Sequence, residues 1–122
     1  MGGKIVTLVE IEGKSGHEPL AREIAMHVAA ESPEYLKPEE IPASVRAREE
    51  EIARGQVVGK PPQIVDKIVA GKMKAFYDQA CLLAQKFVKD NSITIADLVA
   101  NEAKKSGQHL VLKWFIRWKV GE

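Results

Sequence analysis

The chain has 122 residues, a length that suits one domain. Its 18 basic and 17 acidic residues give a net charge of +1, which argues against general nucleic-acid binding and against an anionic membrane surface as the main task. No apolar run approaches the ~18 residues of a membrane span, and the N-terminus lacks the long apolar core of a signal peptide. We therefore expect a partner that is neither nucleic acid nor a membrane.

The first predicted element is a strand over Lys4–Glu12, where apolar and polar residues alternate and β-branched residues dominate. A helix follows to about Ala30, and Ser15 and Glu18 have the spacing of a capping box at its start. Residues 13–15 (Gly-Lys-Ser) match the end of a phosphate-binding loop motif. That motif also needs a glycine five residues before Gly13, where this chain has Leu8, so we predict a simple turn. Residues 32–36 break the helix, and residues 35–36 could form a very short strand.

Residues 41–83 are predicted to form two antiparallel helices, at about 42–58 and 62–83, joined at residues 59–62. In the first helix Val45 and Ile52 fall seven apart, which is typical of a narrow coiled-coil seam. The second helix carries a wider apolar stripe. We expect this hairpin to project from a body made of residues 1–40 and 84–122, with its tip in solvent and its base packed.

The rest of the chain is predicted to complete the body. Residues 84–91 are expected to be irregular, and Thr94 with Asp97 signals the start of a helix that Gly107 closes. Residues 109–120 predict a strand with one apolar face (Leu110, Leu112, Trp114, Ile116, Trp118 and Val120). Its other face carries a basic row, Lys113, Arg117 and Lys119, which would suit an antiparallel neighbour bearing Glu10 and Glu12. The predicted fold is a single α+β domain: a small antiparallel sheet packed against helices, with a protruding antiparallel helical hairpin.

Few residues lie in a pattern that indicates a disulfide, a metal site or a catalytic site. Cys81 is the only cysteine, which excludes an internal disulfide, indicates a reducing compartment and, on an apolar helix face, predicts a buried structural thiol. The three histidines have no metal-ligand spacing, so no metal and no cofactor is expected. His27 borders an apolar helix stripe, and it is either a half-buried, hydrogen-bonded side chain or a contact to a partner. Because no nucleophile and base are paired, we expect a binding module and not an enzyme.

Residues 20–36 (LAREIAMHVAAESPEYL) resemble elongation factor Ts, the guanine-nucleotide exchange partner of elongation factor Tu. The likeness continues in collinear order through residues 37–43, the turn at 59–61, residues 64–74 and 81–90, and the closing segment 115–122. The resemblance covers nearly the whole chain. It aligns the chain with the C-terminal half of the family's core, often called the dimerisation domain, with the coiled-coil hairpin inserted.

The resemblance implies a translation elongation factor that binds elongation factor Tu and supports GDP release, in a bacterial cytoplasm or an organelle interior. Two family features, a small N-terminal helical domain and a Thr-Asp-Phe-Val stretch whose phenylalanine acts as a wedge, are absent from these residues. We therefore expect a piece of a longer factor that alone binds its partner without full exchange activity.

The expected partner-contact residues are His27, Pro33, Glu34 and Tyr35. The family likeness supports His27 best, whereas the other three rest on expected exposure and proximity. The alternative is a self-associating structural module that forms a homodimer through the sheet face bearing the tryptophans or through the hairpin.

Overall fold

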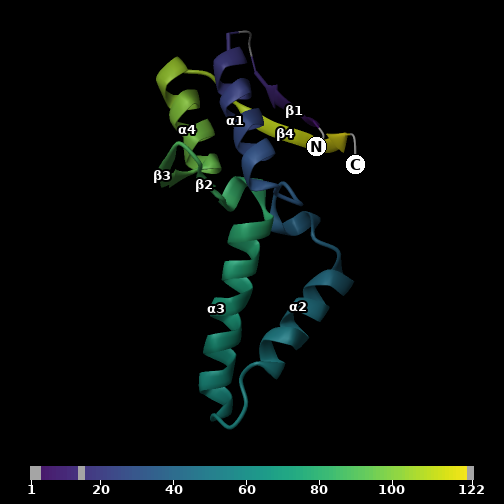
Figure 1. Cartoon of the computed structure of the whole chain (residues 1–122). Coiled ribbons are helices and arrows are strands. Elements are labelled where there is room, and N and C mark those ends of the chain that lie inside the picture. The colour runs from purple at the N-terminus through teal and green to yellow at the C-terminus, as the bar shows by residue number, and fades with distance from the viewer. Residues whose placement is uncertain (1–3, 14–15, 121–122) are drawn as a thin grey trace.

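A computed structural model describes residues 4–13 and 16–120. The elements along the chain are β1 (Lys4–Glu12), α1 (Glu18–Glu31), the 3-10 turn η1 (Pro38–Glu40), α2 (Ala43–Gly55), α3 (Pro62–Ala80), the 3-10 turn η2 (Leu82–Ala84), β2 (Lys86–Phe87), β3 (Asp90–Thr94), α4 (Ile95–Ser106) and β4 (Val111–Val120). The predicted α+β class is confirmed. Figure 1 shows α2 and α3 extending away from a body that contains all the other labelled elements.

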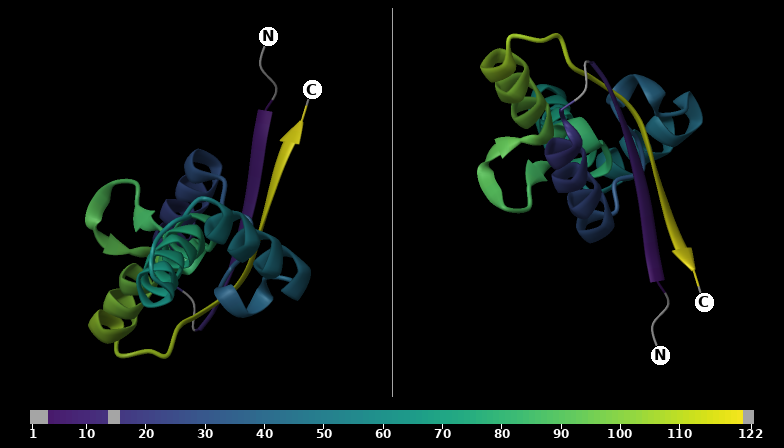
Figure 2. Two further views of the ribbon diagram at one scale, coloured as in Figure 1. Left: turned by 90° about the horizontal axis from the view of Figure 1, so that it is seen from below. Right: turned by 90° about the horizontal axis from the view of Figure 1, so that it is seen from above.

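The first and last strands pair antiparallel, as the sequence predicts, with Lys4 opposite Val120 at one end and Glu12 opposite Val111 at the other. Helix α1 packs against one face of this two-stranded sheet, and the Thr7 hydroxyl donates a 3.0 Å hydrogen bond to the Ala25 carbonyl. Figure 2 shows β1 and β4 running side by side along one flank of the helices. One face of the sheet is therefore packed and the other is open.

A β-bulge divides the last strand. Glu10 lies opposite Trp114 and Ile11 opposite Leu112, so Lys113 is the extra residue. Such an insertion changes which side chains face the core on either side of it. Before the bulge Leu112 points inward. After it Phe115 packs on the core, whereas Trp114 and Trp118 are exposed.

The bulge makes two sequence expectations wrong. The apolar row predicted from residue 110 to residue 120 does not share one face, because the alternation restarts at Lys113. Arg117 does not join an outer basic row: its Nη2 donates to the Ala29 carbonyl in α1 at 3.5 Å, on the packed side of the sheet. Lys113 does lie near Glu12, with 3.9 Å between Nζ and Oε1.

The core of the body joins segments from both ends of the chain. Its most deeply buried apolar side chains, Ile24, Val28, Leu82 and Ile95, have no exposed surface. The remaining core members are Leu20, Leu36, Phe87, Val99, Leu110 and Leu112. Helix α4 docks through its first turn, where Thr94 and Asp97 form the predicted capping box, and it ends at Gly107 in the left-handed conformation (φ 69°).

The segment after the helical hairpin is more regular than the sequence suggests. Strands β2 and β3 form a small antiparallel pair, with Phe87 opposite Asp90. The Ser92 hydroxyl and amide both donate to Asp90 Oδ1, at 2.6 and 3.1 Å, and they hold the pKa of that carboxyl below its usual value. At the other end of the body, Ser15 of the predicted capping box lies outside the described residues, and His17 precedes the first helix.

The helical hairpin has a small apolar cluster of its own, formed by Ala53, Val69 and Met73. Helix α2 ends at Gly55 rather than at Val58, and α3 ends at Ala80 rather than at Leu83. Ile52, expected in the seam, is 48% exposed, and its neighbour Ala53 is buried instead. The two helices diverge toward the body in Figure 1, so most of their contact lies in the outer half of the hairpin.

Candidate functional site

The turn after α1 is bonded to the end of α3. Ser32 adopts the left-handed conformation (φ 51°) and donates its N–H to the Val28 carbonyl, and the proline that follows prevents the helix from continuing. The N–H groups of Glu34 and Tyr35 both donate to the Ala80 carbonyl, at 2.9 and 3.0 Å. Three of the predicted contact residues, 33–35, are therefore held in place by the root of the helical hairpin.

These three residues differ in exposure. Glu34 is exposed and Tyr35 is half-buried, whereas Pro33 is buried, so the expected exposure is wrong for the proline. Pro33 is buried because the chain folds back at this point to reach the Ala80 carbonyl. A direct partner contact by any of them stays a prediction.

The turn forms one wall of a hollow of about 310 Å³, and β4 forms the opposite wall. The residues that line this hollow are Pro33, Glu34, Tyr35, Leu36, Glu40, Trp114, Phe115, Ile116 and Arg117. Arg117 Nε is buried, and no described residue accepts its hydrogen. The hollow thus has both apolar and polar side chains in its lining, a mixture that is typical of a surface that contacts another protein segment.

Sequence reasoning missed the β4 side of this hollow. The alternation pattern places Arg117 on the outer face of a regular strand. The bulge at Lys113 turns Arg117 to the packed side of the sheet, and it lines the hollow together with the turn. A bulge of this kind leaves no signal in the sequence, because Lys113 is an ordinary strand residue.

His27, the contact residue that the family likeness supports best, has no exposed surface. Its Nε2 lies 2.8 Å from Gln85 Oε1, and its Nδ1 accepts a 3.1 Å hydrogen bond from the Val88 N–H. Its ring also lies 6.1 Å from that of Phe87. The side chain matches the hydrogen-bonded reading of the sequence. A direct contact with a partner would require it to leave this position.

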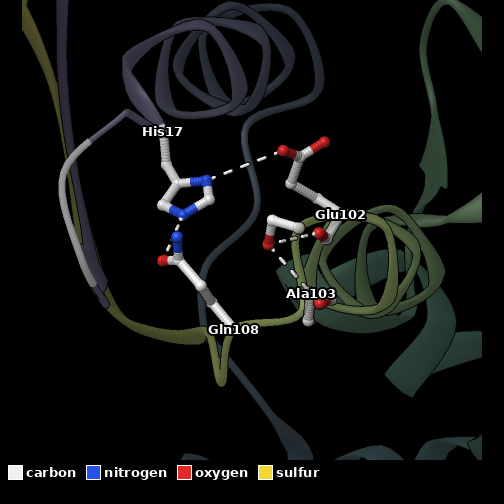
Figure 3. Close-up of polar contacts among 5 residues, drawn as sticks. His17, Glu102, Ala103 and Gln108 are labelled. Atoms are coloured by element: carbon white, nitrogen blue, oxygen red, sulfur yellow. Dashed lines mark hydrogen bonds and ion pairs between the residues drawn. The ribbon is translucent and has the colours of Figure 1, made fainter.

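A second histidine joins the start of α1 to the end of α4 (Figure 3). His17 Nε2 lies 2.8 Å from Gln108 Oε1, and its Nδ1 lies 3.6 Å from Glu102 Oε2. With Ser106 nearby, the residue types match those of a hydrolase triad. However, the Ser106 hydroxyl donates to the main-chain carbonyls of Glu102 and Ala103, at 2.8 and 3.4 Å. This cluster therefore serves as a tie between two helices.

Cys81 is fully buried, as the sequence predicts, but it lies just after the end of α3 in an extended conformation and not on a helix face. Burial raises the pKa of the Cys81 thiol above its ordinary value, and the nearby carboxylates of Glu39, Glu40 and Asp78 raise it further. A thiol in this state is a poor nucleophile. Among residues 4–13 and 16–120, no three His, Cys, Asp or Glu side chains are grouped to hold a metal ion.

The open face of the β1–β4 sheet exposes several apolar side chains. It carries Val6, Leu8, Trp114 and Trp118, which are between 42% and 49% exposed. None of the described helices is both long and apolar enough to pass through a bilayer.

Comparison with known proteins gives one consistent answer. The profile of the family described as Elongation factor TS matches residues 1–122. The elongation factor Ts of Protochlamydia amoebophila is 54% identical over 122 residues, which are 100% of this chain and 43% of that protein. Those of Chlamydia trachomatis serovar L2 and Chlamydia felis are 44% and 40% identical over 119 residues, which are 98% of this chain and 42% of each of those proteins.

The chain spans less than half the length of the curated relatives it matches. The predicted likeness is confirmed, since the family profile covers every residue and the relatives align over nearly all of this chain. The chain belongs to the elongation factor Ts family, and it corresponds to a part of such a factor.

Proposed function

We propose that this chain binds elongation factor Tu and supports the release of GDP from it, as the gripping part of an elongation factor Ts. Membership of the family over residues 1–122 is the observation that carries the proposal. The hollow lined by Tyr35 and Trp114 supports it, because this hollow offers a protein segment a recess lined by apolar and polar side chains. The proposed role is binding, without chemistry of its own, in the cytoplasm.

An exchange factor speeds nucleotide release only if it binds the nucleotide-free partner better than the loaded one, since the two affinities are coupled reciprocally. A surface that binds the nucleotide-free and the nucleotide-loaded partner equally well adds affinity, but it does not shift the equilibrium between these two states. The 122 residues contain no Thr-Asp-Phe-Val sequence. We therefore propose that this chain supplies affinity, and that by itself it accelerates GDP release only weakly.

The proposed contact surface is the turn at Pro33, Glu34 and Tyr35 together with the part of β4 that faces it. Glu34 and Tyr35 offer side chains to a partner directly. Pro33 acts by fixing the turn. His27 contributes from inside the body.

Two measurements test this proposal. Calorimetry with purified elongation factor Tu should detect binding, and Tyr35→Ala should weaken it about tenfold, which is typical of an aromatic anchor at an interface. Glu18→Gln, a charge change on the exposed start of α1, should bind as the unmodified chain does. Stopped-flow release of a fluorescent GDP should show little acceleration. No binding, or a strong acceleration by this chain alone, contradicts the proposal.

The same preparation tests the alternative of a self-associating module. Sedimentation of the chain with and without elongation factor Tu separates the two. A tight dimer that ignores elongation factor Tu would replace the proposed function.

A further inference from the structure

The first half of α2 lies outside both apolar clusters of the chain. Ala53, in the last turn, is the one buried residue of α2, whose residues are all described, and it belongs to the outer cluster of the helical hairpin. Within the described stretch 43–48, Val45 is half-buried and the other residues are exposed. Figure 1 shows this end of α2 standing apart from α3. A buried cluster therefore does not set the separation of the two helices at this end.

Arg46 spans the space between these two helices. Its Nη2 donates a 2.9 Å hydrogen bond to the carbonyl of Pro38 in η1. Its Cζ lies 5.9 Å from the centroid of the Tyr77 ring in α3, a distance at which a guanidinium is attracted to the face of an aromatic ring. One side chain of α2 thus contacts both the segment that precedes this helix and the helix that follows it.

Both partners of Arg46 are held by other bonds. The Pro38 carbonyl also accepts the Ile41 N–H at 3.1 Å, and the side chain of Ile41 is buried. The Tyr77 carbonyl accepts the Cys81 N–H at 3.0 Å, at the root of the helical hairpin. Arg46 therefore connects the start of α2 to two points whose positions the rest of the chain already fixes.

The link between η1 and α2 can act as a hinge. Its two residues, Ile41 and Pro42, have extended backbones with ψ of 124° and 143°. Among the described residues, no side chain caps the start of α2. Hinges in proteins are commonly a few residues of this kind at the ends of elements, where they absorb a change of backbone angle. A rotation at this link would move the first turns of α2 while the outer cluster stays packed.

We propose that Arg46 is a strap that fixes the angle between α2 and α3, and that the first half of α2 swings on the link at residues 41–42 when this strap is released. This inference does not depend on the proposed function. An arginine suits the position, because its planar guanidinium can donate to a carbonyl and lie over an aromatic ring at the same time.

Spin labels on two pairs of exposed positions measure the spread of the helices. Ser44→Cys at the start of α2 and Gln79→Cys at the end of α3 report the inner end of the helical hairpin. Gln56→Cys and Gln63→Cys report its outer end. Both pairs are placed in a chain that carries Cys81→Ala, so that only the introduced thiols are labelled. Electron paramagnetic resonance then gives the distribution of distances for each pair.

Arg46→Met removes the guanidinium and keeps an unbranched side chain. The ratio of released to strapped molecules should rise about tenfold, seen as a broader distribution for the inner pair, whereas the outer pair should not change. Arg48→Met, the same change at an exposed arginine of the same helix, should leave both distributions unchanged. An unchanged inner distribution in Arg46→Met overturns the inference, and so does an equal broadening of both pairs, which would mean that the whole hairpin loosens.

Two substitutions of Tyr77 test the contact with α3. Tyr77→Phe keeps the aromatic ring and should keep the inner distribution, whereas Tyr77→Leu removes the ring and should broaden it. Adding Tyr77→Leu to Arg46→Met should broaden it no further, because both changes remove the same interaction. Circular dichroism establishes that each variant is helical. If Arg46→Met does not fold, the Tyr77 pair still decides, since equal distributions in Tyr77→Phe and Tyr77→Leu overturn the inference.

Discussion

Leu82 and Tyr35 are joined by a 2.8 Å hydrogen bond from the Leu82 N–H to the Tyr35 carbonyl. Around it, Tyr35 and Cys81 form an isolated parallel bridge, and the Leu83 N–H donates to the Leu36 carbonyl at 3.1 Å. The root of the helical hairpin therefore lies directly beneath the turn that we assign to partner binding. Changes at this root should affect both stability and the shape of the contact surface.

Leu82→Ala tests the importance of this root. The side chain has no exposed surface and belongs to the core of the body, so its truncation should lower the free energy of unfolding by about 2–5 kcal/mol. Leu8→Ala, on the open sheet face at 48% exposure, should cost far less. Chemical denaturation of both variants measures the difference, and equal losses would contradict the assigned core.

The capping box of α4 provides a second test. The Thr94 hydroxyl accepts from the Asp97 N–H, and Asp97 Oδ2 accepts from the Thr94 N–H, each at 3.1 Å. Thr94→Ala removes the first bond and should destabilise the chain by about 0.5–2 kcal/mol. Thr94→Ser keeps the hydroxyl and should retain most of that stability. Thermal unfolding of the pair is the measurement, and an alanine variant as stable as the serine variant would refute the role of the cap.

Two glycines should respond in opposite directions to the same change. Gly71 lies inside α3 with open space around its Cβ position, so Gly71→Ala should stabilise the chain by about 0.5–1 kcal/mol. Gly107 closes α4 at φ 69°, a conformation that alanine disfavours, so Gly107→Ala should destabilise it by about 1 kcal/mol. Urea midpoints of the two variants should shift in opposite directions from that of the unmodified chain.

Cys81 predicts a dependence on alkaline pH. Its thiol pKa is raised in the folded state, so the unfolded chain loses this proton first as the pH rises. The unfolded state then binds fewer protons than the folded state, and stability falls as the pH rises through and above the ordinary thiol range. Denaturation at several alkaline pH values measures this slope, which should flatten in Cys81→Ala. Thiol reagents should also label the native chain slowly, and rapid labelling at neutral pH would contradict the buried position.

Hydrogen exchange should separate the helical hairpin from the body. The hairpin cluster contains three buried residues, Ala53, Val69 and Met73, and the cross-helix pair of Arg54 and Asp66 is exposed to solvent. Amides of α2 should therefore exchange faster than those of α4, which packs on the larger core. Uniform protection across both helices would mean that the chain opens as one unit.

Much of the fold follows from local sequence signals. The β1–β4 pairing, the capping box and the end of α4 at Gly107 were all predicted, since each depends on residues close in sequence or on simple alternation. The β2–β3 pair was not, because two residues of β2 are too few to produce a periodic pattern. Helix ends were off by three residues in α2 and α3, where apolar residues continue past the last hydrogen-bonded turn.

The candidate site was only partly predictable. The sequence pointed to Glu34 and Tyr35, which line the hollow, but not to Arg117, whose position depends on a bulge two pairs from one end of the β1–β4 ladder. The full burial of His27 could not be predicted from the sequence either. It depends on Gln85 and Val88, which are about sixty residues away in sequence.

The apolar clusters of the body and of the helical hairpin share no residue. The hairpin is therefore attached to the body mainly at its root, and its outer part packs on its own cluster. Adding matched turns to α2 and α3 would move the tip farther from the body without changing the core, and a reporter group attached near Lys60 would measure that distance.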